Sequence, residues 1–83
     1  MKVTVKLFAM LSTYLPPGSD KHEAELEVAE GATPASLIEQ LALPPKMTHL
    51  VLVNGVYVPP NERARFKLSN GDALAIWPPV AGG

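Results

Sequence analysis

Alternation of apolar and polar residues predicts two β-strands in the first third of the chain. Residues 2–8 place Val3, Val5 and Leu7 on one side, with lysine and threonine between them. Residues 23–28 alternate in the same way, with glutamates between apolar residues. A period of two is typical of strands that bury one face. If these strands form a hairpin, the lysines of the first lie across from the glutamates of the second.

The next segment carries the signals of a short helix. Thr33 can cap its first turn, and Pro34 suits the first helical position because its φ is already fixed. An apolar stripe follows at helical spacing, made of Leu37, Ile38 and Leu41. We expect the helix to end at Pro44-Pro45, since proline cannot donate the backbone hydrogen bond that a helix needs.

The second half of the chain predicts further strands and turns. Residues 49–53 and 56–58 flank Asn54-Gly55, the preferred two-residue hairpin turn, because both turn positions need a positive φ. The sequence predicts another turn at residues 68–72 and a last strand at residues 73–77. Between the first two strands, residues 9–15 suit a short helical turn.

These elements predict an α+β architecture. One helix cannot cover both faces of a sheet, so we expect it to pack on one face of a mixed sheet of four to five strands. This is the β-grasp, or ubiquitin-like, arrangement, in which the first and last strands lie side by side and parallel. A chain of 83 residues has room for one domain. We expect that domain to span residues 1–77 and an extended tail to span residues 78–83.

Composition excludes several kinds of chemistry. The absence of cysteine excludes disulfides, a cysteine-ligated zinc site and a cysteine nucleophile in this chain. His22 and His49 lie in no triad or metal-ligand spacing, so we interpret them as surface residues and expect no metal site. The acidic residues concentrate between Asp20 and Glu30. We interpret this run as a solvated strand face, with a docking surface as the alternative.

Charge and hydropathy bear on partners and location. The net charge of −1 gives no electrostatic reason to bind nucleic acid or an anionic membrane. No uncharged apolar stretch approaches the ~20 residues that a membrane-spanning helix needs. We therefore expect no nucleic-acid or membrane partner, and a cytoplasmic location.

Two aromatic residues fall on the polar side of their strands. Phe8 has the phase of the lysines in the first strand, and Trp77 has the phase opposite to Leu74 and Ile76 in the last. If these strands are neighbours, both rings extend an apolar patch on the exposed face of the sheet. Such patches often mark partner surfaces. The alternative is a bulge or strand end that turns a ring inward.

The C-terminal tail has an unusual composition. Its sequence is Pro78-Pro79-Val80-Ala81-Gly82-Gly83. Two prolines favour an extended spacer, and the tail spans up to about 20 Å. The glycines lack Cβ, so their backbone can enter a narrow channel and leave the terminal carboxyl unhindered. This composition suits a protein whose own C-terminus is the substrate.

Several segments together resemble a known family, the small sulfur-carrier subunit of molybdopterin synthase. The resemblance is most specific at Leu68–Gly83 and extends to Val3–Ala9, Glu30–Thr33 and Val53–Gly55. It is weakest at residues 12–22 and 42–48, which are loops and do not bear on the tail.

The resemblance implies a carrier that is not an enzyme by itself and binds no cofactor stably. An adenylating enzyme related to ubiquitin activators would use ATP on the Gly83 carboxylate, and a sulfur donor protein would convert it to a thiocarboxylate. Gly82 would give narrow access, and the insertion into the large synthase subunit would use Pro78, Pro79, Val80 and Ala81. Phe8 and Trp77 match apolar positions where the family meets that subunit.

Other functions fit the same features. A sulfur carrier of the thiamine pathway shares the fold and the Gly-Gly end, and a tungsten-cofactor variant would look the same. A ubiquitin-like modifier would join the C-terminus to lysines of other proteins. The simplest alternative is a β-grasp interaction module with an inert tail.

Overall fold

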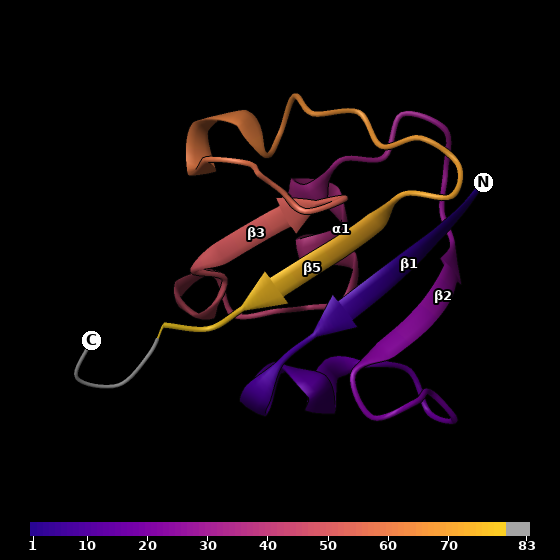
Figure 1. Ribbon diagram of the computed structural model, residues 1–83, viewed down its shortest axis with the longest axis vertical. Helices are drawn as coiled ribbons and strands as arrows, with labels where there is room; N and C mark the ends of the chain where they lie inside the picture. Colours follow the sequence, from indigo (N-terminus) through magenta and orange to yellow (C-terminus); the bar gives the residue numbers. More distant parts are fainter. Residues whose placement is uncertain (80–83) are drawn as a thin grey trace.

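The computed structural model describes residues 1–79, which form a five-stranded mixed sheet and one α-helix on one of its faces (Figure 1). The strands are β1 (Lys2–Leu7), β2 (Glu23–Glu27), β3 (Leu50–Val53), β4 (Val56–Tyr57) and β5 (Ala73–Trp77). Their order in the sheet is β2-β1-β5-β3-β4, with β1 and β5 parallel and the other pairs antiparallel. The predicted α+β architecture and the central parallel pair are confirmed.

The remaining elements are helical. The α-helix α1 spans Pro34–Gln40, and short 3-10 turns span Ala9–Tyr14, Pro45–Met47 and Pro60–Glu62. In residues 1–79, no helix has the length and hydropathy to cross a membrane.

The predicted strand phases are confirmed by burial. Val3, Val5 and Leu7 are fully buried, as are Leu74 and Ile76 on the neighbouring strand. Together with apolar residues from other strands, α1 and several loops they form one core under α1. Its remaining buried members are Leu11, Val28, Leu37, Leu43, Val51, Val53, Val58 and Leu68. The alternation of apolar and polar residues therefore decides which face of the sheet receives the helix.

The lysines of β1 face the glutamates of β2, as predicted. Lys2 lies opposite Glu27 and Lys6 opposite Glu23 in the antiparallel register. The ion pair that forms is a diagonal one, from Lys2 Nζ to Glu25 at 3.7 Å. Both of its side chains are exposed, so it contributes at most about 1 kcal/mol.

The Asn54-Gly55 turn is a two-residue hairpin, as predicted. Both residues have positive φ, 51° at Asn54 and 81° at Gly55. The Asn54 amide also donates to the Asp72 carboxylate (2.9 Å), and its oxygen accepts from the Ala73 N–H (2.9 Å). The hairpin is thereby joined to the start of β5.

The beginning of α1 matches the prediction, but its predicted end is wrong. The Thr33 hydroxyl accepts from the Ser36 N–H (3.1 Å), and the Ser36 hydroxyl accepts from the Thr33 N–H (2.8 Å). The helix then ends at Gln40, before the prolines are reached, because Ala42 adopts a φ of 57°. Two bonds close the end as a Schellman motif, Ala42 N–H to the Glu39 carbonyl and Leu43 N–H to the Ile38 carbonyl, each 3.0 Å.

Candidate functional site

The face of the sheet opposite α1 carries an apolar surface next to the point where the C-terminal tail begins. Cross-strand neighbours share a face. Leu50 pairs with Trp77, and Leu52 pairs with both Ala75 and Tyr57. Among residues 1–79 α1 lies on the other side, behind the sheet in the view of Figure 1. We call this set the outer apolar surface: Phe8, Leu50, Leu52, Tyr57, Ala75 and Trp77.

The two aromatic residues singled out from the sequence lie together. The rings of Phe8 and Trp77 stack with centroids 4.3 Å apart and planes 4° apart. Both residues are half-buried. Stacked aromatic pairs contribute about 0.5–1.5 kcal/mol beyond the area that they bury. The stack therefore fixes the orientation of Trp77 while leaving part of both rings free for contact.

His22 extends this stack on the other side of Phe8. Its ring centroid lies 5.7 Å from that of Phe8, with 22° between the planes. His22 is exposed, as expected from the sequence, but its place in the stack was not predicted. It follows the irregular loop 16–21, so no periodic pattern in the sequence indicates which way its ring points.

The backbone at the end of β5 is held on both sides. The Phe8 N–H donates to the Ile76 carbonyl (3.2 Å), and the His49 N–H donates to the Trp77 carbonyl (3.0 Å). Pro78 is buried and Pro79 is exposed. We call Trp77–Pro79 the tail root. The other predicted tail residues lie outside the described residues: Val80, Ala81, Gly82 and Gly83.

A buried arginine is connected to the tail root through hydrogen bonds to the backbone of neighbouring segments. Arg63 is only 8% exposed, and its guanidinium donates to three backbone carbonyls. Nε donates to Val58 (3.1 Å), Nη1 to Thr48 (2.8 Å) and Nη2 to His49 (3.1 Å). Because the His49 N–H in turn holds the Trp77 carbonyl, Arg63 links the loop after β4 to the start of the tail.

No three His, Cys, Asp or Glu side chains in residues 1–79 gather in a way that would hold a metal ion. The groups that do converge at the tail root are aromatic and aliphatic. Aromatic and aliphatic groups are enriched at the centre of protein–protein interfaces.

The sequence matches the model of the ThiS family over residues 5–83. The chain belongs to the ThiS family. The comparison with curated proteins gives no match.

Solved structures place this ThiS-family chain among ubiquitin-like proteins. SAMP1 from Haloferax volcanii is 27% identical with a TM-score of 0.70, and the alignment covers 100% of both chains. A Pyrococcus furiosus protein, provisionally named molybdopterin converting factor subunit 1, is 29% identical with a TM-score of 0.66. Its alignment covers 95% of this chain and 98% of that one.

A more distant match shares the fold. It is a chain from the complex of subunits 1 and 2 of the molybdopterin-converting factor from Helicobacter pylori. It is 18% identical with a TM-score of 0.60, and 100% of each chain is covered. The ubiquitin-like β-grasp fold predicted from the sequence is thus confirmed, as is the resemblance to sulfur-carrier proteins at the level of the family.

Proposed function

We propose that this ThiS-family chain is a sulfur carrier for molybdopterin biosynthesis, with the C-terminal carboxylate of Gly83 as its reactive group. The observation that carries the proposal is the tail root. The backbone is anchored through Trp77, whose ring belongs to the outer apolar surface, and the Gly-Gly end follows six residues further on in the sequence. A partner that docks on this surface binds next to a tail whose first residue is held in a fixed position.

The chemistry begins with activation of a poor electrophile. A partner adenylating enzyme joins the Gly83 carboxylate to the α-phosphate of ATP and releases pyrophosphate. A sulfur donor protein then supplies sulfur as a persulfide, whose terminal sulfur displaces AMP from the acyl carbon and leaves the acyl group joined to the donor through a disulfide bond. A second thiol of the partner proteins attacks the donor sulfur of that bond, which releases the thiocarboxylate and leaves a disulfide on the partners. ATP is a substrate of the partner in this scheme, so the carrier itself needs no resident cofactor.

Delivery takes place in the large synthase subunit. The thiocarboxylate sulfur attacks a carbon of the pterin precursor and displaces an oxygen substituent, which leaves with a proton. Water then hydrolyses the resulting thioester, which leaves the sulfur on the pterin and restores the Gly83 carboxylate. Gly82 lets the chain pass a narrow channel because it has no Cβ. Pro79, Val80 and Ala81 provide reach beyond the buried Pro78, and Phe8 and Trp77 contact the subunit. The Pyrococcus furiosus match supports this pathway.

Deletion of Gly83 tests the proposal. The variant is expected to lose sulfur transfer to the pterin precursor in a reconstituted synthase. Its amide NMR spectrum is expected to match that of the parent chain, because the deleted residue lies beyond the last anchored strand. Glu39→Gln, an exposed change on α1, is the control and retains transfer. Transfer that survives the deletion contradicts the proposal.

A thiamine-pathway carrier is the second candidate, because the family model that matches covers nearly the whole chain and is that of the ThiS family. The two candidates share the thiocarboxylate and differ in the acceptor of the sulfur. Stable complex formation with a large molybdopterin synthase subunit supports the first. Sulfur transfer to a thiazole-forming enzyme, without such a complex, supports the second.

A further inference from the structure

The two edges of the sheet differ in how open they are. β4 has two residues and is soon followed by Pro59 and Pro60, which donate no backbone hydrogen bonds. β2 has five residues, contains no proline and pairs with β1 in an unbroken register. Among residues 1–79, β1 is its only neighbour. The β2 edge is therefore the one that can accept a further strand.

The hydrogen-bond phase identifies the backbone groups that face this free edge. The Val28 N–H donates to the Met1 carbonyl (2.8 Å), and the Met1 amino group donates back to the Val28 carbonyl (3.0 Å). At the other end, the Leu7 N–H donates to the His22 carbonyl (2.7 Å). The bonding direction alternates along an antiparallel strand. The residues that turn their N–H and C=O groups outward are therefore Glu23, Glu25 and Glu27.

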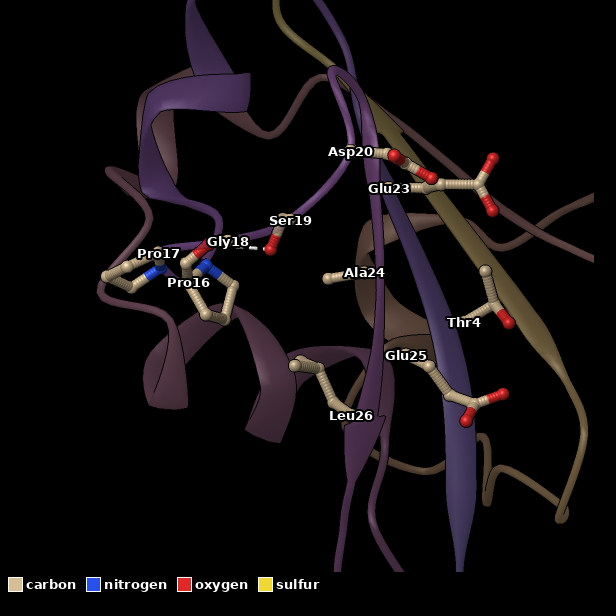
Figure 2. A pocket seen from close by; sticks show the side chains of 10 residues that line it. All are labelled: Thr4, Pro16, Pro17, Gly18, Ser19, Asp20, Glu23, Ala24, Glu25 and Leu26. Atoms are coloured by element: carbon tan, nitrogen blue, oxygen red, sulfur yellow. Dashed lines mark hydrogen bonds between the residues drawn. The ribbon is translucent and has the colours of Figure 1, made fainter.

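A hollow of about 490 Å³ follows this edge, and its two sides differ in chemistry (Figure 2). On one side, Ala24 and Leu26 point toward the loop that contains Pro16 and Pro17. The opposite side carries the carboxylates of Asp20, Glu23 and Glu25. Successive side chains of an extended strand point to opposite faces. A strand added here would thus present one set of residues to the apolar side and the alternate set to the acidic side.

The negative charge of the acidic side is only partly neutralised by Lys2 and Lys6 of β1, which lie opposite Glu27 and Glu23 in the register. Within the described part of the chain, neither Asp20 nor Glu23 forms an ion pair. Glu25 pairs with Lys2 at 3.7 Å, but both side chains are more than half exposed, so this pair is weak and can exchange. An incoming chain with positive charges is favoured here, and an acidic one is repelled.

We propose that the β2 edge binds an extended segment of a partner protein in which lysine or arginine alternates with apolar residues. The outward N–H and C=O groups of β2 form backbone hydrogen bonds with this segment, as they would with an extended segment of any sequence. The cationic side chains of the segment meet Asp20, Glu23 and Glu25, and its apolar side chains meet Ala24, Leu26 and the prolines of the loop.

This surface is separate from the proposed sulfur chemistry. In the sheet order, β1 lies between β2 and β5, so a segment bound on β2 leaves Trp77 and the tail root uncovered. A carrier that hands its C-terminus to successive enzymes thereby has a second place at which a partner can hold it. Failure of the proposal leaves the role of Gly83 untouched.

An NMR titration of the full chain with a short peptide of alternating lysine and valine tests the proposal. We expect slower amide hydrogen exchange at Glu23, Glu25 and Glu27, because these N–H groups gain acceptors. A peptide of alternating glutamate and valine is expected to bind at least about tenfold more weakly. Spermine, which has the charge but no amide groups, is expected to leave those three exchange rates unchanged. Equal effects of spermine and the basic peptide would overturn the proposal.

Two variants separate backbone pairing from charge. Glu25→Pro removes an outward donor without removing a bond to β1, and proline is tolerated at such an edge position. It is expected to weaken the basic peptide about tenfold, and Glu25→Ala less. Glu23→Lys is expected to reduce the preference for the basic peptide. If Glu25→Pro does not fold, N-methylation of the peptide backbone gives the same test on the unaltered protein. Affinity that is unchanged by loss of the backbone donor contradicts strand addition.

Discussion

The indole of Trp77 lies flat on the phenyl ring of Phe8, with ring centroids 4.3 Å apart. Phe8 directly follows the first strand and Trp77 ends the last, and these strands are parallel neighbours at the centre of the sheet. The stack therefore joins the two carboxyl ends of the central strands. It also gives the tail a defined origin beside the outer apolar surface.

Replacement of Trp77 by glutamate is expected to affect binding more than folding. A charge within the outer apolar surface should weaken the complex with a large synthase subunit by about 2–3 kcal/mol or more, as at other aromatic hot spots. Loss of the half-buried ring should lower the free energy of unfolding by only about 1–2 kcal/mol. Calorimetric titration and urea unfolding give the two values. Equal losses would make Trp77 a core residue rather than a contact residue.

Arg63→Met is expected to destabilise the fold by about 2–4 kcal/mol, because it leaves buried backbone carbonyls without donors. Urea unfolding measures this change. Arg65→Met is the matched control, since Arg65 is exposed and makes a weak ion pair with Glu62 at 3.8 Å. The control should shift stability by no more than about 0.5 kcal/mol. A similar small shift for Arg63→Met would show that its hydrogen bonds contribute little.

Ala42→Gly is expected to stabilise the protein by about 0.5–1 kcal/mol. An L-residue in the left-handed region is strained, and glycine relieves that strain despite its greater freedom in the unfolded chain. Thermal unfolding should show a Tm that rises by a few degrees. Ala35→Gly, within α1, is the control and should lower the Tm. A lower Tm for Ala42→Gly would mean that the strain at this position is negligible.

The sequence predicted the parts of the fold that depend on local patterns. The buried phase of Val3, Val5 and Leu7 follows from alternation, and the Asn54-Gly55 turn follows from the φ values that those residues tolerate. Both are decided within a few residues, so they are visible before any tertiary contact is known.

Features that depend on tertiary contacts were missed. The left-handed backbone conformation of Ala42 is unfavourable for an alanine by itself. It accompanies the burial of the next residue, Leu43, which is 4% exposed. Arg63 lies in a loop with several charged residues, which are usually exposed, yet its guanidinium donates to three carbonyls from two separate segments, Thr48–His49 and Val58. The stacking of His22 on Phe8 depends on the path of an irregular loop. None of these follows from a repeat or spacing along the chain.

Intact-mass spectrometry of the full chain tests the central claim most directly. The chain is incubated with an adenylating enzyme, ATP and a sulfur donor, and the C-terminal peptide is then mapped. The account predicts a mass gain equal to the replacement of one oxygen by sulfur, confined to that peptide and dependent on ATP. An unchanged mass, or adducts on lysines of other proteins without the sulfur-containing form, would contradict it.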